Sequence, residues 1–126
     1  MQKGGRSPVC DVLDYGEAVR TRGLSLLTGP GNDLVAATVL VAAGCHLILF
    51  TTGRGTPFGT VVPTVKVATN SDLARRKPHW IDWDAMANGD ETAFAEKVLA
   101  VASGEPAANE RQGARGIAIF KDGVTL

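Results

Sequence analysis

The sequence predicts an α/β fold, a three-layer Rossmann-like domain with a mostly parallel sheet. Residues 24–28 and 46–51 are short apolar runs of the length and composition typical of strands. Residues 34–43 between them are apolar or small at almost every position, which predicts a helix buried on most sides. A strand, a helix and a strand in so short a span form a βαβ unit, which implies parallel strands and a right-handed crossover.

The length of 126 residues predicts a single domain, placed at residues 9–126 after a polar, glycine-rich linker segment at residues 1–8. Hydrophobic residues make up 44% and charged residues 21%, which argues against wholesale disorder. The 13 basic and 13 acidic residues cancel, so we expect neither a nucleic-acid nor a membrane partner. We expect a cytoplasmic protein in which Cys10 and Cys45 are reduced and buried.

Residues 9–19 mix apolar and acidic side chains, and their pattern fits a short helix as well as a strand and a turn. Asp11, Asp14 and Glu17 cluster in this segment. Clustered carboxylates are either half of a metal site or a solvated acidic face, and the sequence leaves both alternatives open.

The predicted helix at 34–43 has clear boundaries. Asn32 is a good N-cap, Asp33 places a negative charge in the first turn, and Gly44 occupies the usual position after the last turn. The preceding glycine-rich turn resembles a dinucleotide-binding motif, but Leu34 replaces its third glycine. The amides at this helix start could hold a small anion, which makes Asn32 and Asp33 candidate substrate-binding residues.

The loop at residues 53–59 follows the strand at 46–51, which we read as buried on both faces. Gly53 and Gly55 permit sharp turns and close approach to a ligand, and Arg54 offers a fork of donors for a carboxylate or phosphate. Open α/β sheets bind ligands at this end of their strands. The alternative is an ordinary turn with a solvated arginine. Hydroxyl groups come from Thr51, Thr52 and Thr56.

Residues 61–69 form the next predicted strand, and Pro63 places it at a sheet edge or leaves its first residues outside the ladder. Lys66 lies mid-strand, where it either reaches the surface or points into a site that lowers its pKa. Asn70 caps a short helical turn at 73–76, and the basic run at 75–77 is typical of a solvated face.

The segment at 78–84 contains both tryptophans with His79 and Asp82. These two side chains could form a general-base pair or half of a metal site, or His79 could serve only in packing. Beyond it we expect a helix at 92–103 that packs on the sheet, a loop at 104–113, a strand at 117–120 and a hairpin ending at 126.

Four blocks of the chain together resemble one protein family. They are residues 31–33 (GND), 49–59 (LFTTGRGTPFG), 62–70 (VPTVKVATN) and 79–82 (HWID). The blocks closely resemble the C-terminal part of the altronate/galactarate dehydratase family, and residues 109–126 are similar to the end of its altronate members. The resemblance covers nearly the whole chain. It departs around residues 85–91, where we expect a shorter loop.

The resemblance implies a C-terminal fragment of a longer enzyme that removes water from a six-carbon polyhydroxy acid. D-altronate would give 2-dehydro-3-deoxy-D-gluconate, and galactarate is the alternative substrate. It also implies a divalent metal, Fe²⁺ or Mn²⁺, held mainly by regions absent from this chain, with ligands that the sequence leaves unknown.

Residue chemistry then suggests roles at the matching positions. We expect Arg54 to bind the carboxylate, and Lys66 to be a base or charge stabiliser. His79 is a second catalytic candidate. The expected substrate contacts are the hydroxyls of Thr51, Thr52 and Thr56, the backbone amides of Gly53 and Gly55, and, as second choices, Asn32, Asp33 and Asn70.

The expected partners are the sugar acid, the upstream domains of the same enzyme and a second copy of the chain, because a fragment exposes the apolar surface that its partner domain covers. We expect the fragment alone to be inactive. The rival interpretations are a non-catalytic folding and dimerisation domain, and a stand-alone module that binds phosphate or nucleotide.

Overall fold

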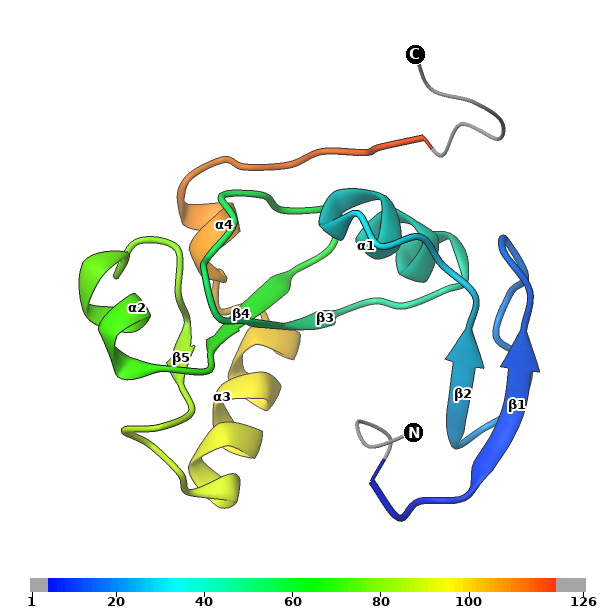
Figure 1. Ribbon diagram of the computed structural model, residues 1–126, viewed down its shortest axis with the longest axis horizontal. Helices are drawn as coiled ribbons and strands as arrows, with labels where there is room; N and C mark the ends of the chain where they lie inside the picture. Colours follow the sequence, from blue (N-terminus) through cyan, green and yellow to red (C-terminus); the bar gives the residue numbers. More distant parts are fainter. Residues whose placement is uncertain (1–4, 120–126) are drawn as a thin grey trace. The chain divides into compact units, whose positions relative to one another are not determined.

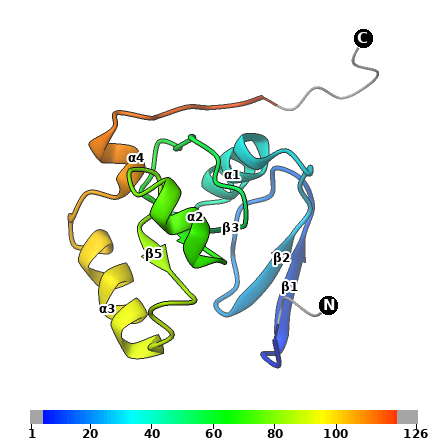
Figure 2. The ribbon, with the colours of Figure 1, turned by 60° about the vertical axis from the view of Figure 1, so that its left-hand side comes forward.

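The computed structural model describes residues 5–119, which divide into two compact units. The first unit contains the described residues up to Cys45 together with Ala118 and Ile119, and the second is His46–Ile117. Helices and parallel strands occur along the chain, as Figure 1 shows. Figure 2 gives a second view of the same elements. The predicted α/β class with mostly parallel strands is therefore confirmed.

The first unit contains two parallel strands, β1 (Val9–Leu13) and β2 (Leu24–Leu27). The register pairs Val9 with Leu24 and Leu13 with Leu27, with an irregularity between Val9 and Asp11. Of the two alternatives for residues 9–19, the structure therefore has the strand followed by a turn.

Helix α1 (Asp33–Ala42) follows β2 and begins as predicted. The side chain of Asn32 accepts a hydrogen bond from the backbone N–H of Val35 at 3.2 Å, which satisfies one of the free donors of the first turn. Gly44 lies just beyond the helix at φ +105°, where glycine is favoured. The cap and the terminating glycine thus set both ends of α1.

The second unit contains a three-stranded parallel sheet in the order β3 (Ile48–Thr52), β4 (Thr64–Ala68) and β5 (Trp83–Asp84). The expectation that residues 24–28 and 46–51 share one sheet is wrong, because β2 pairs with β1 and β3 pairs with β4. The connection from β3 to β4 is the glycine-rich loop rather than a helix. Two small sheets therefore replace the single sheet expected for a Rossmann-like domain.

Strand β4, rather than β3, is the buried strand of this sheet. All five residues of β4 are buried, whereas Leu49 on the edge strand β3 is 48% exposed, so the expectation that β3 is buried on both faces is wrong. Pro63 lies immediately before β4, and its carbonyl accepts the Ile48 N–H at 3.0 Å. A central strand tolerates this proline because the missing donor falls outside the ladder.

Helices cover opposite faces of the second sheet. Helix α2 (Ser71–Arg76) packs Leu73 with Ala68 and Ile81, while α3 (Glu91–Ala102) packs Val101 with Val67. Successive residues of a strand point to opposite faces, so Val67 and Ala68 place these helices on different sides. The core of the second unit thus lies on both faces of β4.

Two predictions for the last part of the chain are wrong. Residues 104–113 contain a short helix, α4 (Ala108–Arg111), rather than only a loop. Residues 117–119 are not in a strand, and Phe120 and the predicted hairpin lie outside the described residues. Among residues 5–119, no helix has both the length and the apolar character needed to span a bilayer.

Candidate functional site

The loop that follows β3 is shaped by Thr52. Its hydroxyl oxygen accepts hydrogen bonds from the backbone N–H of Gly55 at 2.9 Å and of Arg54 at 3.4 Å. Its backbone carbonyl accepts from the N–H and the hydroxyl of Thr69, at the end of β4. The backbone amide of Gly55 is therefore used inside the loop, which corrects the expectation that it faces a ligand.

Four consecutive carbonyls of this loop, at residues 53–56, accept hydrogen bonds from side chains. Asn70 Nδ2 donates to the carbonyl of Gly53 at 3.1 Å. Lys77 Nζ donates to those of Arg54 at 2.8 Å and Gly55 at 3.4 Å. Lys66 Nζ donates to that of Thr56 at 2.6 Å. Three side chains from β4, α2 and their flanks therefore fix the loop.

Gly55 cannot be replaced without strain at the centre of this loop. Its φ is +74°, which disfavours any side chain, and a Cβ there would lie 2.9 Å from Cδ1 of Leu73 and 3.2 Å from Cδ of Lys77. The glycine lets the loop approach α2 closely enough for Lys77 to reach its carbonyls.

Lys66 is a buried cation, only 2% exposed, whose ammonium lies 5.0 Å from the centre of the Phe58 ring. Burial lowers the pKa of Lys66, and the negative charge of Asp82 partly opposes that shift. Of the two alternatives for this lysine, the structure therefore excludes the exposed one. Its Nζ donates to the Thr56 carbonyl, so Lys66 contacts the loop from the buried interior of the second unit.

A pocket of about 270 Å³ lies between the loop and α2. Three cationic side chains line this pocket, those of Arg54, Arg76 and Lys77. Among the described residues, the guanidinium of Arg54 has no hydrogen-bond or ion-pair partner. Asp72 is the one carboxylate in the lining and pairs with Arg76 at 2.9 Å. Since three cations face one carboxylate, the pocket favours an anion. Its lining residues are Gly53, Arg54, Asn70, Asp72, Leu73, Arg76 and Lys77.

The remaining predicted residues of this region are placed as follows. Thr51 is exposed and Thr56 is half-buried, so both lie near the surface of the loop. Asn70 serves mainly in the fold, because its Oδ1 accepts the Leu73 N–H at 2.8 Å as the cap of α2. The structure therefore brings Arg54, Asn70 and the threonines together in one region of the second unit.

Asp82 does not form the predicted pair with His79. The buried carboxylate accepts from the backbone N–H of Lys66 at 3.0 Å and of Ala108 at 2.7 Å, and Arg111 lies at 3.5 Å. His79 is exposed beside Trp80 and Arg111, and its backbone carbonyl accepts from the side chain of Gln112. Asp82 thus joins β4 to α4, and among the described residues no hydrogen bond or ion pair connects its carboxylate to His79.

Asn32 and Asp33 belong to the first unit, at the start of α1. The Asn32 side chain caps that helix, so its oxygen is already used by the Val35 N–H. Asp33 is exposed.

The acidic cluster of the first unit is also engaged in local hydrogen bonds. Asp11 accepts from the hydroxyl of Thr21 at 3.2 Å, and Glu17 accepts from the backbone N–H of Asp14 at 2.7 Å. In the part of the chain that the structure describes, no three His, Cys, Asp or Glu side chains group as metal ligands would. The described residues therefore do not fit the implied metal ion.

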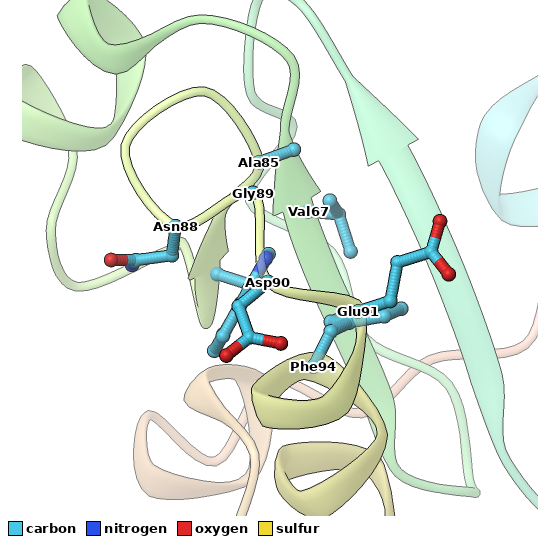
Figure 3. Close-up of a pocket in the computed structure, with 8 residues that line it drawn as sticks. Val67, Ala85, Asn88, Gly89, Asp90, Glu91 and Phe94 are labelled. Atoms are coloured by element: carbon cyan, nitrogen blue, oxygen red, sulfur yellow. The ribbon is translucent and has the colours of Figure 1, made fainter.

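A second pocket lies where α3 begins (Figure 3). Val67, Trp83 and Phe94 line it and also pack against the core, with the two rings 5.4 Å apart. At its rim, Asp90 caps α3 by accepting the Thr92 N–H at 2.8 Å. This pocket shares no lining residue with the pocket between the loop at residues 53–56 and α2. It lies where the core of the second unit is exposed.

The predicted site residues do not include the three other charged side chains of the anion-favouring pocket, Asp72, Arg76 and Lys77. The basic run at 75–77 was expected to be a solvated face, and Arg75 and Arg76 are indeed largely exposed. The only signal that could have singled out Lys77 is its position one helical turn after Leu73, the residue that packs beneath Gly55.

Comparison with known proteins now identifies the family. The family model for the C-terminal part of D-galactarate/altronate dehydratases matches residues 1–125. This chain belongs to that family. The chain is 55% identical over 133 positions to an altronate dehydratase of Bacillus subtilis (strain 168), and 53% identical over 132 positions to one of Escherichia coli (strain K12).

Each of these two alignments includes 99% of the chain, which spans 27% of the length of either relative. A galactarate dehydratase (L-threo-forming) of Escherichia coli (strain K12) is 42% identical over 93 positions, which include 71% of the chain and 18% of that relative. The two longer alignments exceed the 126 residues of the chain, so both relatives contain residues that it lacks.

Proposed function

We propose that this chain is the C-terminal domain of a sugar-acid dehydratase that converts D-altronate to 2-dehydro-3-deoxy-D-gluconate and water. The observation that carries the proposal is the sequence identity of 53–55% to two altronate dehydratases over 99% of the chain. The similarity to the galactarate enzyme is lower and shorter, at 42% over 71% of the chain. Galactarate is therefore the second candidate substrate.

In this proposal the loop at residues 53–56 binds the acid end of the substrate. Arg54 carries a guanidinium without a partner among residues 5–119, and it lines a pocket in which cations outnumber carboxylates. A guanidinium binds a carboxylate through two parallel hydrogen bonds. Thr51 and Thr56 supply hydroxyls for the sugar chain, and Thr52 can still donate its own hydroxyl hydrogen.

Lys66 supports this site as a positioning residue. Its Nζ is buried and donates to the Thr56 carbonyl, which supports a role in holding the loop more than one in taking a proton from C2 of the substrate. His79 is exposed and stays an untested candidate for proton transfer. We assign the base and the ligands of an Fe²⁺ or Mn²⁺ ion to the rest of the protein.

The dehydration needs a base for the C2 proton and stabilisation of the negative charge that develops beside the carboxylate. We assign that stabilisation to the rest of the protein, where a divalent metal could supply it as a Lewis acid. The role of this chain is to hold the substrate carboxylate so that the C2 proton faces the base and the C3 hydroxyl faces the stabilising group.

The test is Arg54→Ala in the full-length protein, assayed with D-altronate and galactarate by formation of the 2-keto acid. We expect the wild-type protein to prefer altronate. The substitution should lower kcat/KM at least about tenfold, the loss typical of a charge-assisted hydrogen bond.

Arg75→Ala is the control, because Arg75 is exposed on α2 and does not line the pocket. It should leave kcat/KM within about threefold of wild type. An equally small effect of Arg54→Ala would remove the carboxylate role and favour a domain that only shapes the enzyme. Preference for galactarate would replace altronate as the substrate.

A further inference from the structure

The geometry points to Arg76 as a second guanidinium that binds the substrate carboxylate together with Arg54. This inference rests on the proposed function and deepens it, since it names the groups that recognise the acid end. Both arginines line the pocket between the loop and α2. The ligand is a hydroxy acid with one carboxylate at this end.

The charges of the pocket leave Arg54 and Arg76 for the ligand. Lys77 is committed to the loop, because its ammonium donates to the carbonyls of Arg54 and Gly55 and lies 4.7 Å from the centre of the Trp80 ring. Arg54 has no side-chain partner among the described residues. The pocket therefore contains one guanidinium without a partner, that of Arg54, beside one that pairs with the exposed carboxylate of Asp72, that of Arg76.

Arg76 can exchange its partner without leaving a carboxylate unpaired. Asp72 binds two arginines, with Oδ1 3.3 Å from Arg75 and Oδ2 2.9 Å from Arg76. When Arg76 turns to a ligand, Arg75 still neutralises Asp72. Exposed ion pairs of this kind contribute little to stability, so the exchange costs little.

The chemistry of the lining selects a hydroxy acid over a simple anion or a neutral polyol. Two guanidinium groups can bind both oxygens of a carboxylate, which a neutral polyol lacks. The Asp72 oxygen released by Arg76 can accept a hydrogen bond from a hydroxyl next to that carboxylate. Asp72 also disfavours ligands with a second negative charge nearby.

Arg75 and Arg76 form a matched pair for the test. Their side chains are 75% and 76% exposed, both lie on α2, and both pair with Asp72, but only Arg76 lines the pocket. The experiment compares Arg76→Gln with Arg75→Gln in the full-length protein. It measures KM and kcat for D-altronate, and inhibition constants for the aldonate D-gluconate and the neutral polyol D-sorbitol.

We expect Arg76→Gln to raise KM for altronate and the inhibition constant of gluconate about tenfold, with kcat within about threefold, because binding is lost equally in the ground and transition states. Arg75→Gln should change neither by more than about twofold. Sorbitol should inhibit weakly, and equally in all three proteins. Thermal unfolding of each variant checks that the fold is retained.

If Arg76→Gln and Arg75→Gln raise KM and the inhibition constant of gluconate equally, the inference is overturned. Such a result would show that the weaker binding comes from losing an ion pair with Asp72, which both arginines form. No effect of Arg76→Gln would also overturn it. If Arg54→Ala lowers kcat/KM while Arg76→Gln does not, the proposed function stands and only the second guanidinium fails. If neither Arg54→Ala nor Arg76→Gln changes the kinetic constants, the proposal that the loop binds the substrate carboxylate fails together with the proposal for Arg76.

Discussion

At the scale of single residues, the loop carbonyls at 53–56 show how a few side chains shape the candidate site. Each carbonyl accepts from Asn70, Lys77 or Lys66. Hydrogen bonds from charged donors contribute about 1.5–3 kcal/mol each, more than neutral ones. Because the carbonyls are held by these donors, the exposed charge that the loop presents is that of Arg54.

Lys66 makes the stability of the chain depend on pH. Folding lowers its pKa below the ordinary value of 10.5, so the unfolded chain binds this proton more tightly than the folded chain. The free energy of unfolding therefore rises with pH between the lowered pKa and 10.5, and the cost of burying the ammonium is fully present below that window.

Lys66→Met should remove this dependence, because methionine fills a similar volume without a charge. Urea unfolding of the 126-residue chain from pH 7 to 10.5 checks it. The wild-type free energy of unfolding, minus that of Lys66→Met, should increase as the pH rises. A difference that stays flat or falls would contradict the burial of a charged lysine.

At the scale of elements, close packing of the segment between β3 and β4 depends on Gly59. A Cβ on Gly59 would overlap the Ala114 carbonyl and the side-chain amide of Asn109, and would lie 2.6 Å from Asn109 Cβ. Asn109 is itself buried, and its Oδ1 accepts the Thr64 N–H at 3.2 Å. This glycine therefore lets three segments of the second unit meet.

Gly59→Ala should lower the free energy of unfolding by about 1–3 kcal/mol, the usual cost of overpacking. Gly89→Ala is the matched control, because a Cβ there meets no atom within 4 Å and its φ is not positive. Denaturant unfolding should place the control within about 0.5 kcal/mol of wild type. Equal stability of the two variants would contradict the packing described for Gly59.

Local signals are enough to predict several of these elements. Asparagine side chains at 32 and 70 cap α1 and α2, and Pro63 precedes β4 rather than entering it. The helix expected at 92–103 is α3, displaced by one residue. Caps, prolines and helical periodicity act over a few neighbouring residues, so they can be read from the sequence.

Contacts between distant residues could not be predicted in this way. The apolar runs at β2 and β3 look alike in sequence, and nothing local shows that each pairs with a different partner. The spacing of His79 and Asp82 suggests a pair, yet the partners of the Asp82 carboxylate lie 16, 26 and 29 residues away. At the site, sequence therefore identified the loop but not the side chains that hold it.

At the scale of the whole molecule, the chain spans 27% of the length of its altronate dehydratase relatives and exposes several large apolar side chains. Exposed apolar surface of this kind is typical of contact with another domain or a second copy. We propose that the rest of the enzyme covers it. The most exposed are Val12, Met86, Leu99, Ile117 and Ile119.

The isolated chain should therefore form no 2-keto acid from altronate with Fe²⁺ or Mn²⁺, whereas the full-length protein should. Side-by-side assays at equal concentration check this, with light scattering to measure self-association of the fragment. Turnover by the fragment alone would place the base and metal within the chain. Asp11, Asp14, His46 and His79 would then be the ligands to test.

The three contacts of Asp82 join residues that are synthesised at different times. The carboxylate is complete only when Ala108 and Arg111 are present, and a buried charge without its partners costs about 3–5 kcal/mol. A nascent chain that ends at β5 therefore lacks two of the three partners of the Asp82 carboxylate. We therefore expect this unit to close only after α4 has left the ribosome.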